Sequence, residues 1–169
     1  MSKRIVSITT VTMTATADTA NLVDATYPFL VQGGSSTQRV NILEIYFGGQ
    51  MSANAIAIML LSRDSTVAVT NSNGTGQTDA SLDPAAAALA APALTGNTNT
   101  TKPQRSSTLH LHNLTFNAFG GIVLWRPASP DQAPTVLGNT ASFGEASVSA
   151  FTGSTASTVV GGHMVYEPQ

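Results

Sequence analysis

The sequence predicts an all-β fold, an antiparallel β-sandwich of jelly-roll type. Short runs rich in β-branched and aromatic residues alternate with clusters of Gly, Pro, Asn and Ser, which is typical of such sandwiches. Helical periodicity is almost absent along the chain. A length of 169 residues suits one domain. We therefore expect residues 1–169 to form a single β-sandwich domain, in which residues 1–16 could extend as an N-terminal arm.

Ten segments have the composition and the bounding turn residues of strands. They are Arg4–Ala15, Pro28–Gln32, Gln38–Phe47, Ala55–Ser62, Val67–Thr70, Thr108–Asn113, Gly121–Arg126, Thr135–Leu137, Ala146–Phe151 and Thr158–Tyr166. In Arg4–Ala15 the apolar phase slips near Thr9 and Thr10, as a bulge or a strand crossing would require. Residues 55–61 are apolar on both faces, which predicts a central strand, or one with a side covered by a neighbouring subunit.

One segment departs from the β pattern. Asp83 suits a helix N-cap, Pro84 suits the first helical position, and the alanine run that follows ends before Pro92. We expect a short Ala-rich helix over Asp83–Ala91. Because so short a helix is marginal alone, it should rest on the sandwich through the leucines Leu82, Leu89 and Leu94.

Four Gly-Gly doublets are predicted to form corners at or inside strand ends, where close backbone approach or a positive φ is needed. They are Gly33-Gly34, Gly48-Gly49, Gly120-Gly121 and Gly161-Gly162. No predicted helix follows any of them, so they do not match a phosphate-binding loop.

The chain is poor in charge, which bears on its partners. Charged residues make up 9% of the sequence, against roughly 25% in an average soluble domain. With a formal net charge of −2, self-repulsion is weak and association is favoured. Seven scattered Lys and Arg argue against nucleic acid as a partner. No apolar run approaches the roughly 18 residues of a membrane helix, so no membrane association is expected.

Two long connections are candidate contact regions. The polar loop Thr95–Ser107 contains Lys102 and Arg105. Trp125–Pro134 contains three prolines, which suit a segment that runs along a sheet edge or projects from the domain. The predicted edge strands have few lysines, the residues that commonly prevent an edge strand from pairing with another chain. A partner subunit that covers the edge is the simplest explanation.

Residues able to support catalysis are sparse. His110 and His112 would leave one face of a strand together, but a metal site needs further ligands. The candidates for these are His163, Glu145 and Glu167. The competing interpretation is two solvent-facing histidines flanked by inward leucines, Leu109 and Leu111. No nucleophile elbow is present, so we expect no enzyme activity and no cofactor.

Glu44 is the one acid within an apolar strand. We expect it to pair across strands with an arginine. The candidate partners are Arg39, Arg63 and Arg126.

The layout resembles the small head-decoration (cement) proteins of tailed bacteriophages, which have β-sandwich or jelly-roll folds. Five segments, in this order along the chain, carry the likeness: Thr14–Ala20, Val40–Gly49, Leu82–Ala90, Gly121–Pro127 and Gly161–Pro168.

The resemblance implies a structural virion protein on the outer capsid surface, made in the host cytoplasm. It implies binding to the major capsid protein, self-association as a homotrimer, and no catalytic residues. The contact regions would be the N-terminal arm Ser2–Thr12 and the two long connections. The residues we single out as interface candidates are Lys3, Arg4, Lys102, Arg105, Trp125 and Arg126, with Tyr27 and Phe29 as further aromatic anchors. A core position for Trp125 is the alternative.

Two alternatives stay open. Jelly rolls also serve as carbohydrate- or receptor-binding modules, for which one Trp and three Tyr are a thin supply of aromatic residues. A metal-dependent oxygenase of the double-stranded β-helix type would require His110, His112 and a carboxylate to converge.

Overall fold

The computed structural model describes residues 27–32, 39–66, 75–76, 82, 85, 94–96, 104–137, 145–152 and 160–169. Its strands are β1 (Tyr27–Gln32), β2 (Arg39–Gln50), β3 (Ile56–Thr66), β4 (Thr75–Gly76), β5 (Leu94–Gly96), β6 (Gln104–Asn117), β7 (Phe119–Trp125), β8 (Thr135–Leu137), β9 (Glu145–Thr152) and β10 (Val160–Pro168). A single 3₁₀ turn, η1 (Pro130–Gln132), is the helical element among these residues.

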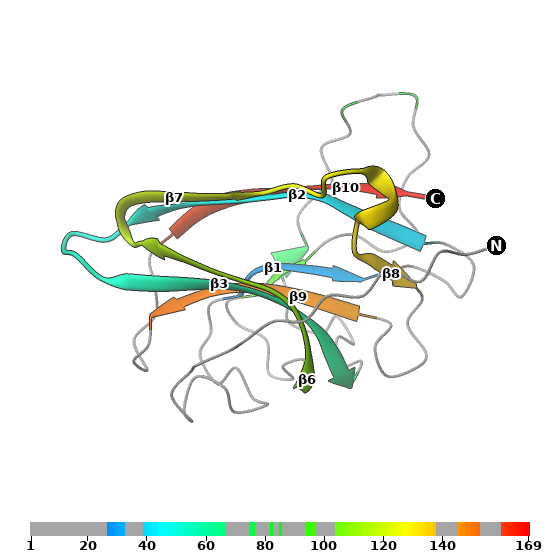
Figure 1. The fold of residues 1–169 in the computed structure, drawn as a ribbon, viewed down its shortest axis with the longest axis horizontal. Coiled ribbons are helices and arrows are strands. Elements are labelled where there is room, and N and C mark those ends of the chain that lie inside the picture. Colours follow the sequence, from blue (N-terminus) through cyan, green and yellow to red (C-terminus); the bar gives the residue numbers. More distant parts are fainter. Residues whose placement is uncertain are drawn as a thin grey trace.

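The strands form two antiparallel sheets that lie in two layers (Figure 1). One sheet has the order β4-β5-β1-β9-β3-β6, and the other has the order β10-β2-β7, with β8 also pairing β2. The β6–β7 turn carries the chain from the first sheet to the second. The predicted antiparallel β-sandwich is confirmed.

The core lies between the two sheets. From β2 it takes Val40, Ile42, Ile45 and Phe47, and from β3 it takes Ala57, Met59 and Leu61. Leu60 is also fully buried, although it lies outside that core cluster. β3 lies between β9 and β6, so the predicted central strand is confirmed. Burial of its second face is partial, since Leu60 is fully buried but Ile56 is 70% exposed.

Strand positions were predicted better than strand ends. Thr135–Leu137 is predicted to the residue, whereas β6 begins at Gln104, inside the segment expected to be a polar loop. That loop prediction is wrong at both ends, because Leu94–Gly96 also pairs, with β1 and β4. Backbone pairing outweighed the polar composition of these segments, because an antiparallel sheet can have one solvated face that accepts polar residues.

Several predictions fall where the structure gives little or no description. The strands expected at 4–15 and 67–70, the Gly33-Gly34 corner and most of the expected helix at 83–91 lie outside the described residues. Leu82 is described and is 89% exposed, so its expected role as an anchor is wrong.

Three of the glycine doublets can be compared with the expected corners. Gly48-Gly49 and Gly161-Gly162 lie within the paired strands β2 and β10, where Gly48 is opposite Gly161. These two doublets are therefore not corners. Close approach is nevertheless needed, since a Cβ at Gly49 would overlap the backbone of Ala118. Gly120 has a φ of +72° where β7 starts, which fits a corner.

The proline-rich connection joins two strands on the same side of β2. β7 pairs with Ile45–Gln50 and β8 pairs with Arg39–Asn41, so the chain between them bypasses the middle of β2. In this middle part of β2 the pairing with β10 also shifts, because Leu43 is an extra residue without a partner in β10. The backbone N–H of Ile42 donates to the Pro134 carbonyl at 2.9 Å. The Pro134 end of this segment therefore lies at the edge beside β2, which is one of the two placements expected for it.

Candidate interaction surface

The β10-β2-β7 sheet has an outer face, directed away from the core. Ile45 and Phe47 are fully buried, so the alternate residues of β2 point outward. Cross-strand pairing then aligns residues of β10, β2 and β7 in three rows across the outer face. The rows are Val165, Glu44 and Arg126; His163, Tyr46 and Leu124; and Gly161, Gly48 and Ile122.

A single carboxylate cross-links all three strands of this face. The Arg126 Nε donates to Glu44 Oε2 at 2.5 Å, and His163 Nε2 lies 2.6 Å from Glu44 Oε1. The Glu44 side chain is 14% exposed, whereas those of Arg126 and His163 are 64% and 56% exposed. The predicted pairing of Glu44 with an arginine is confirmed, and Arg126 is the partner.

The environment of Glu44 stabilises its charged form. Hydrogen bonds from His163, first, and from Arg126 hold the pKa of this carboxyl below its ordinary value, against a smaller opposing effect of burial. Glu44 is therefore ionised at neutral pH, and it anchors two exposed groups that bear or can gain positive charge. This end of the face therefore presents the Arg126 guanidinium beside an ionised carboxylate.

The other part of the face is apolar and flat. Ile122 is 66% exposed and Leu124 is 50% exposed, on a strand with no charged residue between Phe119 and Trp125. The Tyr46 ring stacks on the His163 ring, with centroids 5.2 Å apart and planes inclined at 16°. Gly48 and Gly161 add no side chains to the row of Ile122. Exposed aliphatic side chains beside an arginine and a tyrosine are the composition of an interaction surface.

Trp125, weighed both as an interface anchor and as a core residue, packs against the core. It is half-buried, and its ring lies against that of His112 of β6, with centroids 4.3 Å apart and planes inclined at 34°. These rings link the edge strands of the two sheets. His112 was expected to face solvent, and that expectation is wrong: burial lowers the pKa of its imidazole.

The remaining interface candidates are placed only in part. Lys3, Arg4 and Lys102 lie outside the described residues. The backbone of Arg105 pairs with Asp64 in the β3–β6 ladder, and Tyr27 and Phe29 lie in β1. Of the six interface candidates, Arg126 is the one that the structure places, exposed, on the outer face.

Sequence reasoning missed His163 as the second partner of Glu44, and Ile122 and Leu124 as exposed residues. His163 is 119 positions from Glu44, so no local pattern connects them. For β7 a signal was present: alternation that buries Val123 and Trp125 turns Ile122 and Leu124 outward.

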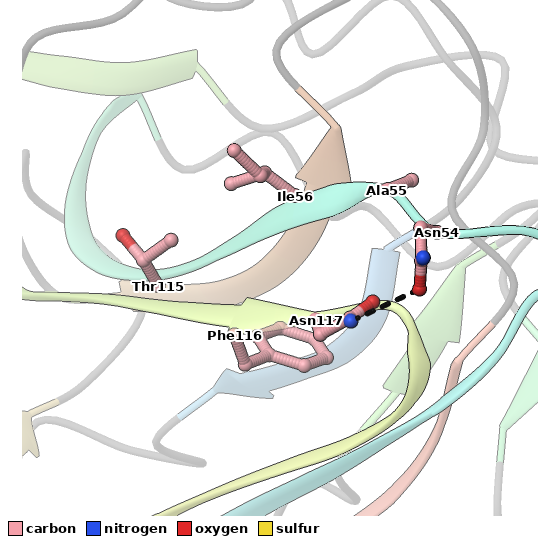
Figure 2. Close-up of a pocket in the computed structure, with 6 residues that line it drawn as sticks. All are labelled: Asn54, Ala55, Ile56, Thr115, Phe116 and Asn117. Atoms are coloured by element: carbon pink, nitrogen blue, oxygen red, sulfur yellow. Dashed lines mark hydrogen bonds between the residues drawn. The ribbon is translucent and has the colours of Figure 1, made fainter.

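A shallow pocket of about 260 Å³ lies at the end of β3 and β6 (Figure 2). Its walls are mostly apolar, and Asn117 closes one side by donating to Asn54 Oδ1 at 3.3 Å. The lining residues are Asn54, Ala55, Ile56, Thr115, Phe116 and Asn117. No ionisable side chain lines it, so it offers apolar contact rather than acid–base chemistry.

His112 and His163 lie in separate surroundings. The His112 ring contacts Trp125, whereas His163 pairs with Glu44. Within the described part of the chain, no three His, Asp or Glu side chains are close enough to share a metal ion. Over the same residues, no helix has the length and apolarity needed to span a membrane.

Comparison with protein-family models, with curated proteins and with solved structures finds no match for this chain.

Proposed function

We propose that this protein is a structural virion protein that decorates the outer surface of a capsid, binds the major capsid protein and strengthens the joints between capsomers. The observation that carries the proposal is the outer face, where Ile122 and Leu124 expose apolar surface beside Arg126. In a chain with 9% charged residues, such a face favours permanent association.

The mechanism is binding alone. A stable interface buries about 800 Å² on each partner, and a flat sheet face with few long charged side chains can approach another surface closely. A bound copy that spans two capsomers adds interface area to both, so their separation would require breaking its contacts as well. The resemblance to head-decoration proteins supports the same role and implies assembly as a homotrimer.

The proposal is tested by co-sedimentation with capsids of the encoding virus that were prepared without this protein. We expect saturable binding by the wild type and at least tenfold weaker binding by Leu124→Asp. Ile56→Asp, which changes a similarly exposed aliphatic residue on the other sheet, is the matched control and should bind as the wild type does. A wild-type chain that stays in the supernatant would contradict the proposal.

A second candidate function is carbohydrate binding, and one observation favours it. The Tyr46 ring, stacked on His163, lies next to the Glu44 carboxylate, and an aromatic ring beside an acid is the combination that sugar sites use. Binding of the purified chain to a glycan array, lost in Tyr46→Ala, would favour this function. Capsid binding without glycan binding would favour decoration.

A further inference from the structure

Over the described residues, both outer strands of the β10-β2-β7 sheet are edge strands. Among the described residues β7 pairs with β2 alone, and β10 likewise pairs with β2 alone. Neither strand has a lysine, and β7 has no charged residue at all. Proteins normally protect sheet edges with charges, prolines or cover. β7 has neither a charge nor a proline, and β10 has them only at its end, in Glu167 and Pro168, so both edges are suited to pairing with another strand.

The two edges are complementary in charge. Arg126 follows β7 directly and uses its Nε for Glu44, which leaves the terminal guanidinium nitrogens for a second carboxylate. Glu167 is an exposed carboxylate near the end of β10, and no described residue forms an ion pair with it. One edge therefore ends in a cation and the other in an anion.

The directions of the strands match as well. β7 and β10 are each antiparallel to β2, so they run parallel to each other. A second copy placed beside the first in the same orientation would bring its β10 alongside β7 as a parallel strand. Residues that face outward on one strand would then meet outward residues on the other.

We propose that β7 of one copy pairs with β10 of a second copy, joining their sheets edge to edge in a head-to-tail contact. The inference rests on the proposed function, because it adds a contact between copies to the same β10-β2-β7 sheet. In the register that pairs Arg126 with Glu167 of the second copy, Leu124 lies beside its Val165. Ile122 lies beside its His163, and Gly120 lies beside its Gly161.

The register has a physical basis. It aligns the terminal guanidinium nitrogens of Arg126, whose Nε binds Glu44, with the exposed acid of the β10 edge, and it covers Leu124 with an aliphatic neighbour. Because the contact joins the β7 edge of one copy to the β10 edge of another, a copy bound through one edge can still bind a further copy through its other edge. Repetition gives a closed ring if the rotation between copies closes, and an open chain if it does not.

The test is sedimentation velocity of the full chain over a range of concentrations. We expect wild-type self-association, weakened at high salt because salt screens the Arg126–Glu167 contact. Ile122→Lys puts a charge on the edge and should raise the dissociation constant at least tenfold. Ile56→Lys, at a residue that is 70% exposed on the other sheet, should leave it unchanged.

A charge reversal tests the register. Glu167→Arg should weaken association at least tenfold, and the double variant Glu167→Arg with Arg126→Glu should recover most of it. Circular dichroism of each variant checks the fold, because Arg126→Glu also removes a partner of Glu44. A wild type that is monomeric at every concentration, or equal association of Ile122→Lys and Ile56→Lys, would overturn the inference.

The capsid assay separates this inference from the proposed function. A monomeric wild type that still binds capsids would overturn the edge contact alone. A chain that self-associates through β7 and β10 but binds no capsid would overturn the decoration proposal alone.

Discussion

Two adjacent glycines in β2 provide a sharp test of the packing between the sheet and the β6–β7 turn. A Cβ built at Gly49 would overlap the Ala118 backbone, closest at the carbonyl oxygen and with the Cα at 2.6 Å. Real Cβ atoms do not approach other atoms so closely, and backbone cannot rotate aside as a side chain can. The same atom at Gly48 would meet only the end of the Tyr46 side chain, with Oη at 3.3 Å.

The two substitutions should therefore differ in cost. Gly49→Ala must push β2 away from Ala118, whose backbone carbonyl accepts the Met51 N–H at 2.9 Å and whose N–H donates to Ala55 at 2.8 Å. Overpacking of this kind costs about 1–3 kcal/mol, and we expect the upper half of that range because both hydrogen bonds are strained together. Gly48→Ala should stay within about 1 kcal/mol of the wild type, because alanine also restricts the unfolded chain.

The assay is urea and thermal unfolding followed by far-ultraviolet circular dichroism. For a chain of this length each 1 kcal/mol corresponds to about 2–4 °C in Tm, so Gly49→Ala should melt roughly 4–12 °C lower. Gly48→Ala is the internal control at the neighbouring position. Equal stability of the two variants would refute the close packing of β2 against Ala118.

Three further predictions concern the core and the ionisable groups. Phe47→Ala, at a fully buried core position, should lower the free energy of unfolding by about 3–5 kcal/mol, measured in urea; a loss below 1 kcal/mol would contradict its burial. His163→Gln should raise the carboxyl pKa of Glu44 toward 4.5 in an NMR titration, and an unchanged pKa would refute the assigned hydrogen bond. In the wild type the stability due to Glu44 is present above pH 4.5 and is lost as the pH falls toward its lowered pKa. Since burial lowers the pKa of His112 below 6.5, stability should also decline as the pH falls below 6.5, because the unfolded chain binds the proton more readily. His112→Leu should abolish that decline, followed by the fluorescence of Trp125, the single tryptophan, and a persistent decline would contradict the assignment.

The fold class was predictable because strand periodicity is a local signal. In β2 and β7 the alternation of side chains identifies the buried residues, and turn residues separate the strands. Strand ends were less predictable. The beginning of β6 is polar, yet its backbone pairs with β3 as far as Gln104, and such pairing depends on a neighbour that is distant in the sequence.

On the outer face of the β10-β2-β7 sheet, the sequence allowed a prediction only for a residue whose type is unusual in its strand. Glu44 stands out as an acid in an apolar strand, so an arginine partner was expected, but the choice of Arg126 depended on β7 pairing with β2. The second partner, His163, depended on β10 pairing with the other side of β2. Neither strand pairing can be read from the local sequence.

His112 shows how a small irregularity defeats periodicity. Leu61 pairs with His112, but the next residue of β3, Ser62, pairs with His110, so Leu111 is an extra residue in β6. A bulge of this kind interrupts the alternation that had turned both histidines toward solvent. The β6–β7 turn then brings Trp125 against the His112 ring, a contact between two sheets that strand patterns do not reveal.

The central claim is that this protein is a structural component of a virion shell, and cryo-electron microscopy of intact particles tests it most directly. The account predicts β-sandwich density on the outer capsid surface, across the joints between capsomers, that is absent from particles made without the gene. Particles whose outer surface is identical with and without the gene would contradict it.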